Sequence, residues 1–202
     1  MAKEISRFFD SVGGDRKYPS EEFVDYFRTF LTDGIKNGGT NLQVTATGIG
    51  MSVYVGYGTS LVNGHQYTLK DDGGGKKTLQ IPAVDTQPRI ERVVVRCDTS
   101  TNVRTTSVYI LTGVAGASPS APSLTRAGNV YEISLARINV RANATSILDS
   151  DIIDERYDSD VCGLINSLIQ LDASEFQAQA EIILENLKDQ GYIPISEAVT
   201  AA

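Results

Sequence analysis

The middle of the chain alternates apolar and polar residues with the period of a β-strand. Residues 51–57 alternate strictly, which is typical of a half-buried strand. Asn63-Gly64 is a tight-turn signal between two short runs rich in Val, Leu, Tyr and Thr. Residues 89–97, 103–111 and 130–140 are longer runs of the same type. Because no helical pattern separates these runs, they predict a mainly β fold, an antiparallel β-sandwich or barrel with flanking helices.

A helix is predicted before the β region. Pro19-Ser20 followed by two glutamates is a helix start, because Ser20 can cap free N–H groups and the acids favour the positive end of the helix dipole. An apolar stripe with spacings of three and four follows, formed by Phe23, Phe27, Phe30 and Leu31. Four large apolar groups on one face require a covering surface, so we expect this helix to pack on the β domain.

A second helical pattern lies near the C-terminal end of the chain. Residues 172–175 have the polar-x-x-Glu spacing of a capping box. An apolar seam with the rhythm of a coiled coil runs through Ile169, Ala173, Phe176, Ala180, Ile183 and Leu187. This seam predicts either self-association, with three copies as the expected number, or docking of the helix on its own β domain.

These patterns divide the chain into an N-terminal helical segment (1–40), a β-sandwich domain (41–160) and a C-terminal helical tail (161–202). Of the 202 residues, 41% are apolar and 21% are charged, which excludes a disordered or collagen-like chain. The formal net charge is −7. That charge argues against nucleic-acid binding, because such affinity comes largely from Lys and Arg neutralising phosphates.

Targeting signals and cysteines add two expectations. No apolar run exceeds four residues and no signal-peptide core follows the first Met, so we expect a protein made in a cytoplasm without membrane insertion. Cys97 and Cys162 belong to no CxxC pair, so no zinc or redox motif is predicted. Both are expected to be small buried hydrophobes, and a disulfide between them is the alternative.

Candidates for catalysis are few. His65 is the one histidine, it lies beside a turn, and no Gly-x-Ser-x-Gly motif accompanies it. Residues 73–78 fail the spacing of a phosphate-binding loop, since a second Lys interrupts it. Six carboxylates at 149–160 could ligate calcium, but their order is not that of an EF-hand. We therefore interpret 149–160 as a segment that anchors itself to the fold, and we predict no catalytic, cofactor-binding or metal-binding residue and no enzyme.

Two groups of residues are candidates for binding. Four arginines on the predicted long hairpin could face an acidic partner, although a solvated strand face is the preferred interpretation: Arg89, Arg92, Arg96 and Arg104. Four side chains around the first turn could stack on and hydrogen-bond to a sugar: Tyr54, Tyr57, His65 and Tyr67.

Six stretches in the same order carry a resemblance to a known family. They are Phe8-Phe9-Asp10-Ser11-Val12-Gly13-Gly14-Asp15-Arg16-Lys17-Tyr18 and residues 61–67, 89–96, 117–122, 130–136 and 154–157 with Cys162-Gly163. This order resembles the N-terminal domain of tail and baseplate structural proteins of siphophages that infect Gram-positive hosts, including Bacillus phages. Related domains occur in receptor-binding and tail-fibre proteins. The resemblance implies a β-sandwich module with helical flanks that serves as a virion part, and it brings no catalytic residues.

Longer relatives continue into a stalk and a receptor-binding head, whereas this chain stops about 40 residues after the β domain. The sequence therefore predicts a non-enzymatic assembly or adaptor module of a tail tip or baseplate, located in the virion, whose partners are other phage tail proteins. The alternative is binding of host cell-wall carbohydrate. A cell-wall hydrolase has the least support, because no acid pair stands out.

Overall fold

The computed structural model describes residues 4–73, 75–82, 86–169 and 174–189, with only the backbone described at 174–176 and 189. The chain divides into two compact units, Met1–Leu168 and Ile169–Ala202. The first, called the β unit below, holds three antiparallel sheets and one α-helix among its described residues. The second holds one α-helix in its described part. Each unit is treated by itself.

The longest strands form one antiparallel sheet. Its order is β11 (Ile152–Asp154), β10 (Val130–Val140), β7 (Arg89–Asp98) and β8 (Thr105–Leu111), and β9 (Arg126–Ala127) pairs with the start of β10. A short 3₁₀ helix, η1 (Asp149–Asp151), precedes β11. The three runs that the alternating pattern predicted are β7, β8 and β10, so the prediction of a mainly β unit is confirmed.

Six shorter strands make the other two sheets, in the orders β1-β4-β5 and β2-β3-β6. Their bounds are β1 (Gly34–Ile35), β2 (Val44–Ala46), β3 (Ser52–Val55), β4 (Gly58–Val62), β5 (His65–Leu69) and β6 (Lys77–Gln80). The Asn41 side chain bonds to Thr59 of β4: its Oδ1 accepts from the Thr59 amide at 2.8 Å, and its Nδ2 donates to the Thr59 carbonyl at 3.1 Å. These bonds tie the segment before β2 to the β1-β4-β5 sheet.

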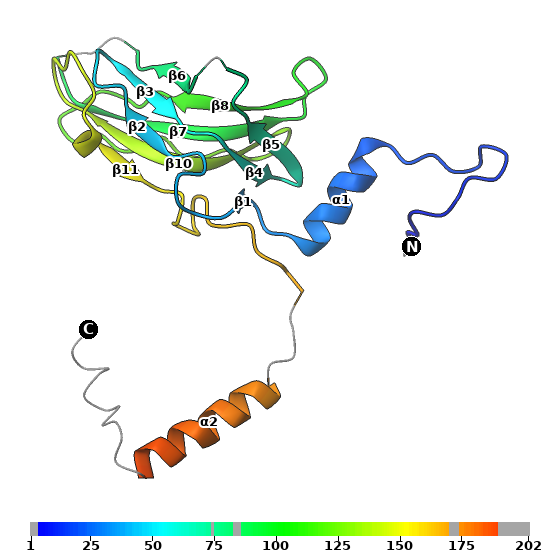
Figure 1. Ribbon diagram of the computed structural model, residues 1–202. Helices are drawn as coiled ribbons and strands as arrows, with labels where there is room; N and C mark the ends of the chain where they lie inside the picture. Colours follow the sequence, from blue (N-terminus) through cyan, green and yellow to red (C-terminus); the bar gives the residue numbers. More distant parts are fainter. Residues whose placement is uncertain (1–3, 74, 83–85, 170–173, 190–202) are drawn as a thin grey trace. The chain divides into compact units, whose positions relative to one another are not determined.

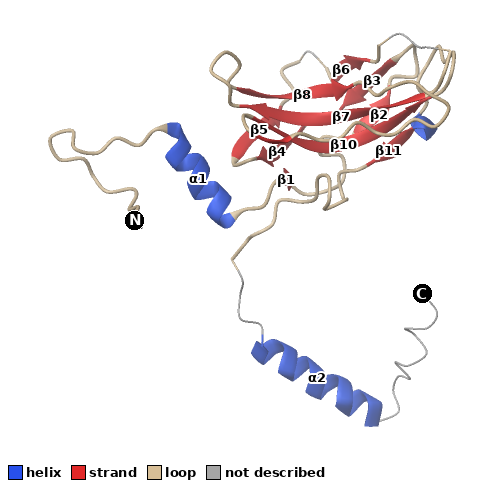
Figure 2. Ribbon diagram, turned by 180° about the vertical axis from the view of Figure 1, so that it is seen from behind, coloured by secondary structure: helices blue, strands red, loops and turns tan. Residues whose placement is uncertain are grey.

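One apolar core joins all three sheets. Val53 and Val55 of β3 and Val62 of β4 are fully buried against Val93 and Val95 of β7. Their alternation along each strand places every second side chain in this core. Figures 1 and 2 show the five-stranded sheet on one side of the core and the short strands on the other. The predicted Asn63-Gly64 turn joins β4 to β5 through a two-residue loop in which both residues have positive φ.

The N-terminal helix forms where the sequence predicted it, but its aromatic stripe is not buried. α1 (Ser20–Phe30) begins after Pro19, and only Val24 is buried in it. Phe23 and Phe27 remain 48% and 44% exposed and Phe30 and Leu31 are half-buried, so the expected packing of the whole stripe on the β domain is not confirmed. The reason is the position of α1, which lies beyond the end of the sheets, next to the β4–β5 turn (Figures 1 and 2).

Contact between α1 and the β4–β5 turn is narrow and close. A Cβ at Gly64, whose φ is +74°, would lie 2.7 Å from the Val24 carbonyl oxygen, so only glycine allows this approach. Arg28 Nε donates to the Asn63 carbonyl at 3.1 Å. One edge of the helix therefore contacts the sheets, and the aromatic stripe lies beside that contact.

Residues 161–168 belong to the β unit, although the sequence placed them in the C-terminal tail. The Ile35 amide donates to the Gly163 carbonyl at 3.0 Å, and the Ile165 amide donates to the Ile35 carbonyl at 2.9 Å. The Leu168 amide donates to the Phe30 carbonyl at 2.8 Å. This segment thus ties the end of α1 and β1 together, a pairing across more than a hundred residues that no local pattern reveals.

In the second unit, α2 (Ser174–Asp189) forms the predicted C-terminal helix. Of the predicted seam, Ile183 is 59% exposed and Ile169, ahead of the helix, is 57% exposed, while Ala180 and Leu187 are half-buried. Ala173 and the side chain of Phe176 lie outside the described residues. The described part of α2 therefore carries exposed apolar side chains.

Candidate functional site

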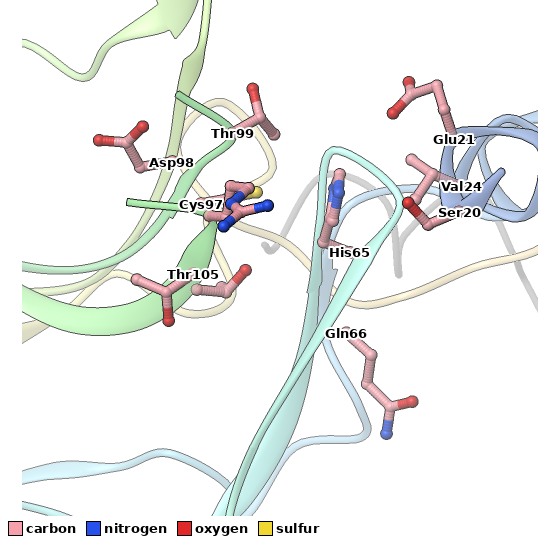
Figure 3. Close-up of a pocket in the computed structure, with 11 residues that line it drawn as sticks. Ser20, Glu21, Val24, His65, Gln66, Cys97, Asp98, Thr99 and Thr105 are labelled. Atoms are coloured by element: carbon pink, nitrogen blue, oxygen red, sulfur yellow. The ribbon is translucent and has the colours of Figure 1, made fainter. Parts of the chain in front are cut away.

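A polar hollow lies at the end of the β unit that carries α1. It has a volume of about 430 Å³ and is lined by Ser20, Glu21 and Val24 of α1, His65 and Gln66 of β5, and residues 97–99 and 104–106 of the β7–β8 hairpin. Figure 3 shows His65 between the α1 residues on one side and Cys97, Asp98 and Thr99 on the other. Three segments far apart in sequence thus meet around one imidazole.

The surroundings of Asp98 and Cys97 in the hollow determine the protonation of each side chain. Asp98 Oδ1 accepts from the Ser100 hydroxyl at 2.6 Å and from its amide at 2.9 Å, and these bonds hold the pKa of Asp98 below its ordinary value. Cys97 is 1% exposed, and burial raises the pKa of its thiol. Near neutral pH the hollow therefore presents a carboxylate and an unreactive thiol.

His65 takes part in no catalytic pair among the residues that the structure describes. Its Nδ1 lies 3.0 Å from the Asn63 carbonyl oxygen, which can only accept, so Nδ1 carries a proton. Nucleophilic catalysis requires a base within hydrogen-bond reach of a hydroxyl or thiol. The hydrogen bond of His65 is instead made with a backbone carbonyl. The polar hollow is equipped to bind hydroxyl or amide groups.

An apolar groove adjoins the polar hollow along the other side of His65. It has a volume of about 570 Å³ and runs between α1 and the β4–β5 hairpin, with Phe23, Phe27 and Leu31 on one wall and Leu61 and Ile165 on the other. Clefts of this size and apolar character are typical of binding sites. The phenylalanines that were predicted to fill the core therefore line a surface groove.

A cluster of aromatic side chains covers the N-terminal arm and α1, and sequence reasoning missed it as a surface. The Phe8 ring lies 5.5 Å from Phe23 and 5.1 Å from Tyr26 between centroids. We call five half-exposed residues the aromatic face: Phe8, Phe9, Phe23, Tyr26 and Phe27, each 42–57% exposed. The available signal was the density of Phe and Tyr between residues 8 and 30.

The structure does not bring the four predicted sugar contacts together. Tyr54 lies under the Lys76 ammonium, 5.7 Å from its ring centroid, and Tyr57 lines a small hollow with the same lysine. Burial and a hydrogen bond with Asp71 raise the pKa of Tyr57. Tyr67 packs against the core, and burial raises its pKa. Only His65 lies in the polar hollow, so a site built from all four is not formed.

The hairpin arginines are largely buried, which corrects the expected solvated strand face. Arg89 and Arg92 are 3% and 8% exposed and pair with Glu91 and Glu155. Arg96 pairs with buried Glu132 and also lies 4.0 Å above the Tyr109 ring. Arg104 alone among these four is exposed, and it lines the polar hollow. Carboxylates neutralise the other three: Glu91 comes from β7 itself, Glu132 from β10 and Glu155 from the segment after β11.

Glu155 is the centre of a buried ion-pair network. Its carboxylate accepts from Arg92 Nε at 3.0 Å and Nη2 at 3.2 Å, lies 2.8 Å from Arg137 Nε, and accepts from the Ser134 hydroxyl. Arg92 Nη1 also donates to the Pro122 carbonyl at 2.6 Å. The network therefore fastens the loop before β9 and the segment after β11 to the five-stranded sheet.

Arginine side chains and a backbone amide of the same chain bind the carboxylates of the acidic segment 149–160. Asp151 accepts from Arg141 at 3.1 Å, Asp154 pairs with Arg156 at 2.7 Å, and Asp149 accepts from the Ala46 amide at 2.7 Å. These partners match the interpretation of an anchoring segment. Among the described residues, no three His, Cys, Asp or Glu side chains gather as a metal site would require.

Both cysteines are free, and burial raises the pKa of Cys162 to about 12. Neither described helix has the length and apolarity that a membrane span requires. Comparisons with protein-family models, with curated proteins and with solved structures each found no match to this chain.

Proposed function

We propose that this protein is a non-enzymatic structural component of a bacteriophage tail tip or baseplate, acting as an assembly or adaptor module within the virion. Its β unit would be a β-sandwich, because the five-stranded sheet and the two short sheets enclose one core. The proposal rests on two kinds of support: the resemblance of six stretches to siphophage tail proteins, and the surfaces that the fold leaves exposed.

Four of the six resembling stretches lie in or beside the sheets of the β unit. Residues 61–67 make the β4–β5 turn, residues 89–96 make most of β7, and residues 130–136 pair with β7 in β10. Residues 154–157 include Glu155, which joins β7 and β10 through Arg92 and Arg137. Stretches that occur in the same order as in siphophage tail proteins, and that contact one another in the fold, support a common domain.

The observation that carries the assembly role is α2. It is a helix of 16 residues in which Ile183, a residue of the predicted seam, is 59% exposed. An isolated helix of this length is marginal in water, and packing of an apolar face supplies most helical stability in proteins. We propose that copies of α2 associate through the predicted seam, most simply as a trimer.

Purified particles of a phage that encodes this chain provide the direct test. We expect peptides of this chain in the mass spectra of tails that have been separated from capsids and washed with high salt. The reason is that an assembled virion component stays with the particle through its apolar contacts, which salt does not weaken. Absence of the chain from complete particles, with known tail proteins present as the control, would contradict the proposal.

Binding of host cell-wall polysaccharide is the second candidate, because the polar hollow offers His65, Asp98 and several hydroxyls side by side. For an assembly module we expect a flat calorimetric titration with host polysaccharide. Saturable binding that His65→Ala weakens tenfold or more, and that Tyr67→Phe leaves unchanged, would instead establish the hollow as a sugar site. Tyr67 is the matched control because it packs on the core.

A further inference from the structure

We propose that β8 is an interface between copies of this chain, in which the free edge of β8 in one copy pairs antiparallel with the free edge of β8 in a second copy. The five-stranded sheets of the two copies would then join into one. This interface lies within the β unit and is separate from the α2 seam. It goes beyond the proposed tail function, because it would connect one group of associated α2 helices with the next.

β8 is the last strand of its sheet and is paired on one side only. Its seven residues run alongside β7, from Thr105 opposite Asp98 to Leu111 opposite Arg92. In Figure 2, β8, β7 and β10 follow one another from the edge of the sheet inward. Among the residues that the structure describes, no segment forms a backbone hydrogen bond with the other side of β8. A row of unpaired N–H and C=O groups at a sheet edge is a template for a further strand.

Most of the other edge strands have a protection that β8 lacks. The Asp149 carboxylate accepts from the Ala46 amide of β2, and residues 163–165 bond to Ile35 of β1. β6 carries Lys77, and β11 has only three residues. Covering segments, charges and short length are the means by which proteins protect sheet edges. β8 has seven residues and contains neither a charge nor a proline, so its edge is open to another strand.

The side chains of β8 match those of a second copy. An antiparallel pair centred on Val108 brings Ser107 opposite Tyr109 of the other copy, in two equivalent pairs. Val108 is 6% exposed and packs in the core, so in this register core-facing side chains adjoin core-facing ones, since side chains alternate along a strand. Arg104, the one charged residue within two positions of β8, would lie opposite Thr112, so no like charges oppose each other. The pair is symmetric and leaves neither β8 edge free.

Tyr109 is held against the sheet without being buried. Its side chain is 48% exposed, and Arg96 Cζ lies 4.0 Å from its ring centroid. Arg96 itself pairs with Glu132 of β10. In the proposed pair the Tyr109 ring would pack beside the small Ser107 side chain of the second copy, so a large side chain meets a small one. The same contact occurs twice in each dimer, because the pairing is symmetric.

The test uses the full chain with the α2 seam disabled by Phe176→Asp and Ile183→Asp. In this background we expect the light-scattering mass to rise from 21.8 kDa toward twice that value as the concentration increases from low micromolar to near-millimolar. Adding Ser107→Lys and Tyr109→Lys places ammonium groups opposite each other, on side chains whose Cβ atoms are about 5 Å apart across the two strands. This double-lysine variant should stay at one copy throughout.

Two further variants separate the pairing register from a damaged fold. Ser107→Lys with Tyr109→Glu, the charge-reversed variant, places each ammonium opposite a carboxylate of the other copy. The dimer should therefore return, at a midpoint concentration at most about one tenth of that of the double-lysine variant. Ile49→Lys with Val114→Lys adds the same positive charge at side chains 82% and 84% exposed elsewhere, and it should dimerise as the background does.

A cross-link supplies an independent readout in the same background. Directly opposite residues of an antiparallel pair have Cα atoms about 4.5–5.5 Å apart, which suits a disulfide. Chains with Ser107→Cys and chains with Tyr109→Cys should therefore form mixed disulfide-linked dimers when they are combined under mild oxidation. Either chain alone should form far fewer, since equivalent positions are diagonal neighbours about 7–8 Å apart. Cys97 and Cys162 are buried, so the introduced thiols react first.

Three results would overturn the proposal. They are one copy at every concentration, dimerisation of the double-lysine variant equal to that of the background, and failure of the charge-reversed variant to dimerise. Each of them leaves the particle test of the tail function unaffected, because that test detects the chain in the virion and does not depend on β8 pairing.

Discussion

Replacing Phe176 and Ile183 with Asp should convert an assembly of about three copies into single chains. At low micromolar concentration we expect the native mass to be near three times 21.8 kDa and the variant mass to be near 21.8 kDa by light scattering. Aspartate carboxylates at positions of a coiled-coil seam would be buried without partners, at a cost of several kcal/mol each. Association through α2 cannot survive two such groups per chain.

The same variant should lose helix content but keep its β unit. α2 has 16 residues, and a helix of that length is marginal without packing, so helical circular dichroism should fall with the loss of assembly. The main thermal transition, which reports on the β unit, should stay within about 2 °C because seam substitutions do not touch its core.

Ile182→Asp is the matched control for the seam. This residue is next to Ile183 and 62% exposed, but it is not part of the predicted seam, because successive residues of an α-helix point in directions about 100° apart. We expect Ile182→Asp to keep the assembled mass. An unchanged mass in the double variant, or monomers in the control, would show that copies do not join through this register.

Glu155→Ala should have the largest effect on the stability of the β unit. The change leaves the Arg92 guanidinium, whose side chain is 10% exposed, without its carboxylate partner. Removing one member of a buried ion pair costs about 3–5 kcal/mol because the remaining charge is uncompensated. Urea unfolding should therefore show a midpoint lowered by at least 1 M at a typical m-value.

Two control variants distinguish the loss of the buried ion pair from the loss of any glutamate, by their effect on the free energy of unfolding. Glu4→Ala removes an exposed carboxylate and should change stability by less than about 0.5 kcal/mol. Arg92→Leu together with Glu155→Leu removes both charges of the buried pair and leaves Arg137, whose side chain is 37% exposed to water. It should recover much of the loss, since apolar replacement of a buried pair is often neutral. Equal stability of Glu155→Ala and the native protein would contradict the network described above.

Several elements were predictable because their causes are local. The β4–β5 turn follows from Asn63-Gly64, whose positive φ values suit a two-residue hairpin. β7 and β10 follow from runs rich in Val, Ile and Tyr, residue types that favour strands. The start of α1 after Pro19 was predicted correctly, but Ser20 does not cap it: Pro19 occupies the N-cap position, no side-chain cap hydrogen bond forms, and Glu21 and Glu22 lie in the first turn. Each depends on neighbours within a few positions, which the sequence displays directly.

Burial of the charged and aromatic side chains was not predictable in the same way. Arg92 looks like a surface residue in sequence, yet Glu155, 63 positions away, pairs with it under a covering loop. Phe23 and Phe27 look like core residues, yet α1 meets the β4–β5 turn along the edge that contains Val24. In both cases the outcome depends on which distant segment returns to cover the side chain.

In the candidate surfaces, too, some features are determined by local sequence and others by contacts between distant segments. The sequence by itself determined the positions of the two helices and of the longer strands, the turn at Asn63-Gly64 and an apolar periodicity in α2, because hydrogen-bond geometry and side-chain periods act over short distances. The short strands β1, β2, β9 and β11 carried no such local signal. Only the tertiary structure decided that His65 lies in a hollow beside Asp98, that Tyr67 packs on the core, and that Phe8 reaches α1. Those facts depend on contacts between segments separated by tens of residues, whose free energies no local pattern contains.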